Sequence, residues 1–175
     1  MPLPAVTLVL GGAASGKSRL AENLVTASGC RPVYIATAQA WDAEMAARIA
    51  AHRMSRADAG WRTVEEPVDL PRALADVTAD EAVLIDCATL WLSNLMLAEA
   101  GLPGAEAALM AALAASPAPV VIVSNEVGQG IVPDNALARR FRDAQGGLNQ
   151  RLAARAGLVI VVMAGLPLVL KGALP

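Results

Sequence analysis

A layered α/β fold with a mostly parallel central sheet is the architecture that this sequence of 175 residues predicts. Short, continuously apolar runs recur along the chain, and such runs are typical of strands that are buried on both faces of a parallel sheet. Longer stretches with helical patterns separate them, and this alternation places helices on both faces of one sheet. The length suits a single domain over residues 1–175, with enough chain to bury a core.

The expected elements alternate along the chain. The expected strands are Val6–Leu10, Pro32–Ala36, Ala82–Asp86, Val120–Ser124 and Leu158–Ala164. The expected helices are Lys17–Ala27, Asp42–Arg56, Leu70–Val77, Thr89–Glu99, Ala105–Ala115 and Asn135–Arg155. The last helix has the clearest pattern, because apolar residues recur every three or four positions in one stripe, namely Leu137, Phe141, Ala144, Leu148 and Leu152.

Several expected strands end in polar or glycine-rich sequence. The first runs into Gly11, the second into Thr37, the third into Asp86, the fourth into the segment 124–126 and the fifth into Gly165. Ligands of such sheets bind at the carboxyl ends of the strands. One edge of the sheet is therefore expected to gather the functional residues.

The composition excludes several classes of protein. Hydrophobic residues make up 55% of the chain and aromatic residues only 3%, so the core must consist mainly of Val, Leu, Ile and Ala. The formal net charge of −2 argues against a general nucleic-acid binder, although a few local arginines could still hold a small anionic ligand.

Neither the cysteines nor the apolar runs indicate a secreted or membrane protein. Cys30 and Cys87 are far apart and form no C-x-x-C pair, so we expect two reduced, packed thiols and neither a disulfide framework nor a zinc site. The uncharged stretch 107–125 is long enough to span a bilayer, but the segment 116–119 contains two prolines that divide it into a helix and a strand. No signal peptide is apparent, and we expect a soluble cytoplasmic protein without membrane insertion.

The segment after the first strand matches the phosphate-loop pattern G-x-x-x-x-G-K-[ST] in full. Its residues are Gly11, Gly12, Ala13, Ala14, Ser15, Gly16, Lys17 and Ser18. It follows an expected strand and opens an expected helix, which is the context that the pattern requires. The backbone N–H groups and the helix N-terminus should cradle phosphates, with Lys17 reaching the β- and γ-oxygens. The alternative, a glycine-rich turn without a ligand, rarely matches pattern and context together.

A metal ion is expected beside this loop. The Ser18 hydroxyl is the usual loop ligand of Mg²⁺, and the strand that ends at Asp86 resembles a Walker B element, whose carboxylate supports the metal. Many buried strands end in Asp without such a role, so the phosphate loop is what favours the metal-side interpretation. Together these features predict a three-layer P-loop NTPase fold of the RecA-like type that binds a nucleoside triphosphate with Mg²⁺.

His52 is the only histidine of the chain, and it falls within the expected helix 42–56. Arg48 and Arg56 lie four residues on either side of it and share its face of the helix. Two guanidinium groups disfavour a protonated imidazole and attract phosphates. A neutral imidazole near a triphosphate could attack phosphorus and form a covalent intermediate. The spacing alone favours a solvated or capping histidine on an arginine-rich surface helix over a catalytic one.

The chain resembles, over nearly its whole length, the family of bifunctional adenosylcobinamide kinases/adenosylcobinamide-phosphate guanylyltransferases of cobalamin synthesis. The segments that carry the resemblance occur in the family's order. They are 11–19 (GGAASGKSR), 34–38 (YIATA), 42–52 (DAEMAARIAAH), 61–67 (WRTVEEP), 86–94 (DCATLWLSN), 124–135 (SNEVGQGIVPDN), 139–143 (RRFRD) and 148–150 (LNQ). The segment 124–135 is not a general P-loop feature and makes the resemblance specific.

The resemblance implies two transfers to a corrinoid. The kinase step would use ATP or GTP to phosphorylate the hydroxyl of the aminopropanol arm of adenosylcobinamide. The second step would place GMP from GTP on a histidine and then pass it to the new phosphate, giving adenosylcobinamide-GDP. Family members often have two adjacent histidines where this chain has Ala51 and His52, so only His52 can serve. The resemblance also implies a homotrimer.

The resemblance further implies a set of nucleotide contacts. Besides the phosphate loop, they are Ala36, Thr37, Ala38, Arg53, Met54, Ser55, Arg56, Glu65 and Asp86. Glu66 adjoins Glu65 and leaves that choice open. Ala14 replaces an arginine that is common in the family, so any contact of that arginine is lost while the loop should keep its shape. Glu126, Asn135 and Arg142 are candidates for substrate or subunit contacts, or equally for helix capping and surface ion pairs.

Two other functions fit the residues. A plain P-loop small-molecule kinase would transfer a γ-phosphate and leave His52 structural. A regulatory GTP-binding module would lack transfer chemistry, but the chain has no N-K-x-D segment to read guanine, and Ser124–Val127 is a poor substitute.

Overall fold

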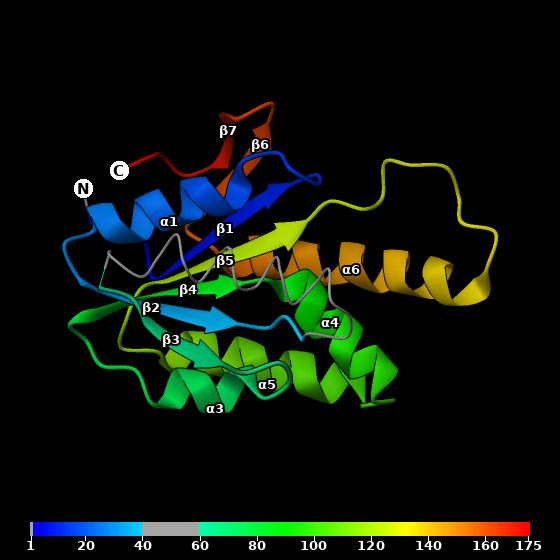
Figure 1. Cartoon of the computed structure of the whole chain (residues 1–175), viewed down its shortest axis with the longest axis horizontal. Helices are drawn as coiled ribbons and strands as arrows, with labels where there is room; N and C mark the ends of the chain where they lie inside the picture. Colours follow the sequence, from blue (N-terminus) through cyan, green and yellow to red (C-terminus); the bar gives the residue numbers. More distant parts are fainter. Residues whose placement is uncertain (1, 40–59) are drawn as a thin grey trace.

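A computed structural model describes residues 2–39 and 60–175 of the chain. Seven strands in these residues form one sheet of order β3-β2-β4-β5-β1-β6-β7 (Figure 1). The strands are β1 Val6–Gly11, β2 Arg31–Ala36, β3 Arg62–Glu65, β4 Glu81–Asp86, β5 Val120–Asn125, β6 Leu158–Met163 and β7 Leu166–Lys171. Every neighbouring pair is parallel except β6 and β7, which run antiparallel.

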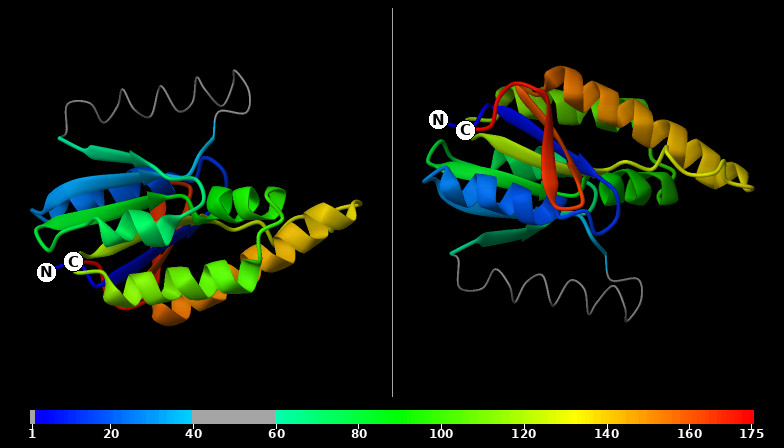
Figure 2. Two further views of the ribbon diagram at one scale, coloured as in Figure 1. Left: turned by 90° about the horizontal axis from the view of Figure 1, so that it is seen from below. Right: turned by 90° about the horizontal axis from the view of Figure 1, so that it is seen from above.

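Five helices of the described residues pack on the two faces of this sheet. They are α1 Lys17–Ala27, α3 Leu70–Ala75, α4 Ala88–Leu97, α5 Leu102–Ala115 and α6 Ala136–Arg155. Helix α1 covers one face, whereas the other face carries helices α3 to α6 (Figure 2). The predicted three-layer α/β fold is confirmed, although the expected helix 42–56 falls outside the described residues.

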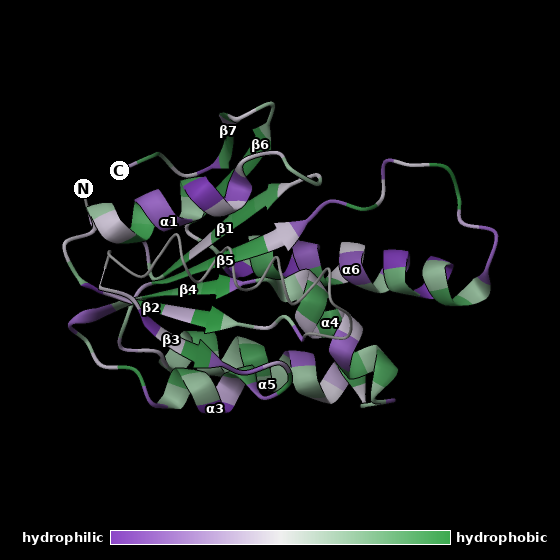
Figure 3. Cartoon of the chain, in the orientation of Figure 1, coloured by the Kyte–Doolittle hydropathy of each residue, from purple (hydrophilic) through white to green (hydrophobic). Residues whose placement is uncertain are grey.

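Side-chain alternation along the strands builds one core on each face. On the face of α1, the strand residues Val9, Leu84 and Val123 pack with Leu24 and Val25 of the helix. On the opposite face, residues one position along each strand, such as Leu8, Ile85 and Ile122, pack against the other helices. Because the central strands are buried on both sides, they are apolar at nearly every position (Figure 3).

Two strands were not predicted, and both lie at edges of the sheet. β3 has the sequence RTVE, whose side chains are mostly exposed, so it lacks the continuous apolar pattern of the inner strands. β7 contains Pro167 and presents mainly exposed side chains, which is compatible only with an edge position. The expected strand 158–164 is confirmed as far as Met163, and the chain then turns through Ala164 and Gly165, which have φ values of 52° and 78°.

The predicted apolar stripe of α6 is buried only over its second half. Leu148 and Leu152 are fully buried, whereas Leu137 is 56% exposed. Figure 1 shows the reason, because the first half of α6 and the segment that connects it to β5 extend beyond the edge of the sheet. Asn135 caps the helix, with its Oδ1 accepting a hydrogen bond from the Ala138 N–H at 2.8 Å.

Candidate active site

Three neighbouring strands bring their carboxyl ends to the same place. β5 lies between β1 and β4, so its last residue separates the phosphate loop from Asp86. Asn125 pairs with Gly11 in the register of β1 and β5, and Asp86 pairs with Val123 in the register of β4 and β5. The expectation that one edge of the sheet gathers the polar strand ends is therefore confirmed.

The phosphate loop has a backbone that depends on its glycines. Gly16 has a φ of 93°, in the region that glycine adopts without strain, and Ala14 has a φ of 54°. A β-carbon on Gly11 would lie 2.8 Å from the Val162 carbonyl oxygen and closer still to the Ser15 hydroxyl. The Gly165 N–H donates to the Ser15 carbonyl at 2.9 Å, so the turn after β6 braces the loop. Ala14 is exposed.

Helix α1 begins directly after the loop, and its N-terminus carries no side-chain cap. The first N–H groups of a helix have no partner within the helix, so those of α1 remain available to an anion. The Lys17 ammonium donates to the Gly12 carbonyl at 3.0 Å and lies over the loop. The Ser15 hydroxyl is buried and has no hydrogen-bond partner among residues 2–39 and 60–175. These features together suit the binding of a phosphate.

Asp86 lies on the same side of the sheet as α1. Two and four residues before it, Leu84 and Ala82 belong to the core beneath α1, and alternation places the Asp86 carboxylate on that face. This carboxylate makes no hydrogen bond or ion pair in the described part of the chain. Burial, and then the charge of Asp86, raise the pKa of the adjacent Cys87 thiol to about 11.

The residues present suit Mg²⁺. One carboxylate from Asp86 and one hydroxyl from Ser18 would leave the remaining coordination positions to water and phosphate oxygens, which is how Mg²⁺ is usually held beside nucleotides. No group of three or more His, Cys, Asp or Glu side chains that could hold a metal occurs within residues 2–39 and 60–175.

Thr37 ties the end of β2 to the end of β4. Its hydroxyl donates to the Cys87 carbonyl at 2.8 Å and accepts from the Cys87 N–H at 2.7 Å. Its own N–H donates to the Asp86 carbonyl, and its carbonyl accepts from the Asn94 side-chain amide at 2.8 Å. Thr37 is fully buried, so within the segment 36–38 it is Ala36 and Ala38 that are partly exposed beside the site.

The structure separates the roles of the two adjacent glutamates. The buried Glu66 carboxylate accepts hydrogen bonds from the N–H groups of Val68 and Asp69 and pairs with Arg72 at 2.9 Å. Burial acts to raise the pKa of Glu66, but these bonds outweigh it and lower the pKa below its ordinary value. Glu65 is exposed at the end of β3 and pairs in register with Ala36 of β2. Glu65 is thus the glutamate whose side chain faces solvent beside the predicted nucleotide contacts.

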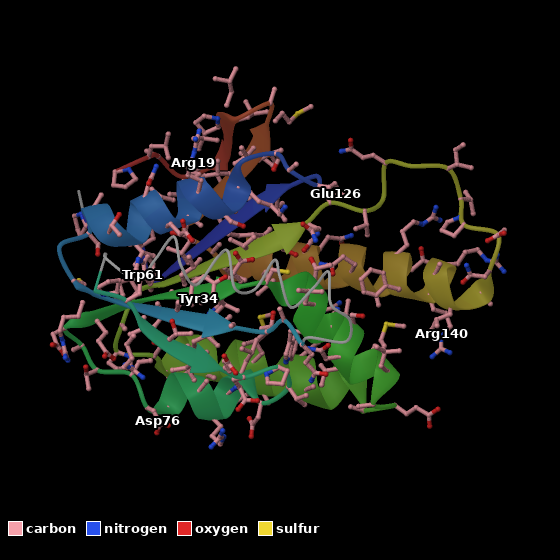
Figure 4. All side chains as sticks on the ribbon, viewed as in Figure 1. Arg19, Tyr34, Trp61, Asp76, Glu126 and Arg140 are labelled. Carbon is pink, nitrogen blue, oxygen red and sulfur yellow. The ribbon has the colours of Figure 1, made fainter. Side chains whose placement is uncertain are left out.

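The other predicted residues are distributed as follows. His52 and Arg53–Arg56 lie outside the described residues. Glu126 follows β5 directly (Figure 4). Its N–H donates to the Gly11 carbonyl at 3.2 Å, and its carboxylate accepts from the Gly128 N–H at 2.7 Å.

Asn135 and Arg142 have structural roles. Asn135 caps α6, and Arg142 forms an ion pair with Asp143 at 3.7 Å. Helix capping and surface ion pairing are the alternatives to substrate or subunit contacts that the sequence left open.

Sequence reasoning missed a buried polar network behind β5. Its side chains are Thr89 of α4, Ser124 of β5, and Gln145 and Asn149 of α6, all buried. The Ser124 hydroxyl donates to Asn149 Oδ1 at 2.7 Å and accepts from Gln145 Nε2 at 2.9 Å. The only signal in the sequence is two amide residues, four positions apart, on the buried side of α6.

The arrangement defines a class of protein, the P-loop NTPases. Solved structures support this fold. The structure of the RadB recombinase superposes on this chain with a TM-score of 0.56 and 19% sequence identity. The superposition covers 91% of this chain and 74% of the recombinase chain. The structure of the flagellar accessory protein FlaH from Methanocaldococcus jannaschii superposes with a TM-score of 0.55 and 11% sequence identity. That superposition covers 98% of this chain and 80% of the FlaH chain.

Sequence comparison then names the family. Residues 7–170 match the family described as cobinamide kinase / cobinamide phosphate guanyltransferase. The chain is 49% identical, over 94% of its length and 96% of the relative, to the bifunctional adenosylcobalamin biosynthesis protein CobP of Pseudomonas aeruginosa. It is also 43% identical, over 94% of its length and 98% of the relative, to the bifunctional adenosylcobalamin biosynthesis protein CobU of Escherichia coli. The chain belongs to this family of bifunctional kinases and guanylyltransferases, as the resemblance implied.

None of the described helices is both long enough and apolar enough to cross a membrane. In particular, the uncharged stretch 107–125 divides into α5 and β5, as its prolines predict.

Proposed function

We propose that this chain catalyses two successive transfers to adenosylcobinamide. In the first, the hydroxyl oxygen of the aminopropanol arm attacks the γ-phosphorus of ATP or GTP. The bond from that phosphorus to the β–γ bridging oxygen breaks, the nucleoside diphosphate leaves, and the hydroxyl proton passes to solvent. In the second, the His52 imidazole attacks the α-phosphorus of GTP and pyrophosphate leaves. An oxygen of the new substrate phosphate then takes GMP from His52, giving adenosylcobinamide-GDP.

The observation that carries this proposal is an intact phosphate-binding cradle in a chain that matches the family over nearly its whole length. The uncapped N-terminus of α1 and Lys17 would bind the phosphate oxygens and orient the γ-phosphorus. Ser18 and Asp86 would hold Mg²⁺, which when bound neutralises charge on those oxygens during transfer. The remaining proposed nucleotide contacts are Ala36, Thr37, Ala38, Arg53, Met54, Ser55, Arg56 and Glu65.

The guanylyl–histidine step is tested by incubating the protein with GTP labelled at the α-phosphorus. We expect label on the wild-type chain in a bond that acid breaks and base preserves, as phosphorus–nitrogen bonds to histidine behave. The His52→Asn variant should remain unlabelled while still transferring the γ-phosphate to cobinamide. Label retained on that variant would exclude His52, and γ-transfer without any labelling of the wild type would indicate a plain kinase.

We further infer a homotrimer, which the family resemblance implies. The β6–β7 hairpin supports an association between subunits, because its apolar side chains Met163, Leu166, Leu168 and Leu170 are 63%, 71%, 56% and 59% exposed. Sedimentation equilibrium of the purified protein should give a mass three times that of the chain. A monomer mass at micromolar concentration would refute the trimer.

A further inference from the structure

Asn125 is the last residue of β5 and lies between the phosphate loop and Asp86. Val121 and Val123 pack in the core beneath α1, so strand alternation turns the Asn125 side chain to the same face. The neighbouring residue on β1 is Gly11, where the loop begins. The Asp86 carboxylate ends the strand on the other side of β5. Asn125 is therefore placed where a phosphate held by the loop and a metal held by Asp86 would meet.

The backbone of Asn125 is held on both sides by side chains from separate helices. Its N–H donates to the Thr89 hydroxyl at 2.8 Å, and its carbonyl accepts from Asn149 Nδ2 at 3.1 Å. Asn149 is in turn bonded to Ser124 and Gln145 within the network behind β5. These four supporting side chains are all at least nine-tenths buried. Such a network fixes the position of a residue more firmly than a strand end usually is.

The side-chain amide of Asn125, in contrast, makes no hydrogen bond to any of the described residues. It is partly buried and carries two N–H donors. Donors in fixed positions beside a transferring phosphoryl group stabilise the negative charge on its oxygens. A neutral amide also suits this place because it neither competes with Asp86 for a cation nor repels the phosphate.

We propose that the Asn125 amide nitrogen donates to a γ-phosphate oxygen of the triphosphate in the loop, and that Thr89 and Asn149 are the residues that position it. The inference rests on the proposed nucleotide site. During transfer the γ-phosphorus exchanges its bond to the β–γ bridging oxygen for a bond to the substrate oxygen. Asn125 gains and loses no covalent bond; its hydrogen bond strengthens as charge accumulates on the γ-phosphate oxygens.

The test compares nucleotides with and without the γ-phosphate. In the Asn125→Ala variant, kcat of γ-phosphate transfer to cobinamide should fall about 100-fold, the loss typical for one donor to a developing oxyanion. Affinity for Mg·GTP should fall, whereas affinity for Mg·GDP should stay within about twofold because GDP lacks the contacted group. Asn125→Asp should bind Mg·GTP more weakly than Asn125→Ala, since its carboxylate repels the γ-phosphate. Asn23→Ala, which removes an exposed amide from α1, is the matched control and should change neither value.

The outcomes separate this inference from the proposed function. Equal losses of GTP and GDP affinity in Asn125→Ala, or an unchanged kcat, would overturn the role of Asn125 and leave the nucleotide site intact. Failure of the wild type to bind either nucleotide would overturn the nucleotide site itself. The role of Asn149 is tested with the double variant Asn125→Ala/Asn149→Ala. Its ratio of GTP to GDP affinity should equal that of Asn125→Ala alone, because the two substitutions disrupt the same interaction with the γ-phosphate. Additive losses of discrimination would exclude Asn149 as a positioning residue.

Discussion

At the scale of single residues, the phosphate loop depends on the absence of a side chain at Gly11. The space that a β-carbon would occupy is already taken by the Ser15 hydroxyl and the Val162 carbonyl. The second of these belongs to the backbone of β6 and cannot rotate away. At Gly12, in contrast, no atom of the described residues beyond its chain neighbours lies within 4 Å of such a β-carbon. The two adjacent glycines therefore have different roles, although the motif lists one as required and the other as free.

We predict that Gly11→Ala destabilises the folded chain and that Gly12→Ala does not. Overpacking of this kind costs about 1–3 kcal/mol, because the loop or β6 must shift to admit the methyl group. The free energy of unfolding from urea titration, measured without nucleotide, checks the difference. Equal stability of the two variants would show that the loop can relax around Gly11 without cost.

At the scale of elements, Glu66 connects the end of β3 to the start of α3. Its carboxylate holds two backbone N–H groups and Arg72, while Asp69 caps the helix by accepting from the Arg72 N–H at 3.1 Å. A six-residue helix such as α3 gains little from its own hydrogen bonds, so these side chains and the burial of Leu70 and Leu74 hold it in place.

This connection should make part of the stability pH-dependent. The folded state lowers the pKa of Glu66, so its contribution is present above the ordinary value of 4.5 and is lost as the pH falls through the lower folded value. Glu66→Gln should reduce the free energy of unfolding by about 1–3 kcal/mol at pH 7. The gap, meaning the difference in free energy of unfolding between the wild type and this variant, should narrow below pH 4.5.

Urea titrations at pH 7 and pH 4 measure this gap. Glu99→Gln is the control, because Glu99 is an exposed carboxylate after α4 that forms no side-chain hydrogen bond or ion pair with the described residues. This variant should unfold with the same free energy as the wild type at both pH values. A gap for Glu66→Gln that widens toward pH 4 would contradict the assignment.

At the scale of the whole molecule, ligand binding should stabilise the fold through the edge where β1, β4 and β5 end. A ligand at 100 times its dissociation constant adds about 2.7 kcal/mol, which raises the thermal midpoint by roughly 5–10 °C for a domain of this size. We predict this rise with Mg·GTP, and a smaller rise when EDTA removes the metal, because Asp86 then faces the phosphates without a cation. Differential scanning fluorimetry checks the shift. Lys17→Ala should abolish most of it, and an equal shift in that variant would place the nucleotide elsewhere.

The sequence by itself determined the features that depend on neighbours along the chain. The phosphate loop, the inner strands and the helices beyond residue 60 could be predicted because φ preferences, continuous apolar runs and helical spacing are local properties. The family resemblance also followed from local segments. The predicted helix 135–155 agrees with α6, Ala136–Arg155, to within one residue. Its apolar stripe did not reveal that Leu137 is exposed, because burial depends on how far the sheet extends beneath the helix.

Only the tertiary structure decided which distant residues meet. Strand order placed β5 between β1 and β4 and so brought Asn125 beside the phosphate loop and Asp86, and no local pattern specifies that order. Packing likewise distinguished Glu66 from Glu65 and joined Ser124 to Gln145 and Asn149 across 21 and 25 residues of chain. The reason is physical: a hydrogen bond between remote side chains forms only after burial has fixed both partners, and that burial is a property of the whole fold.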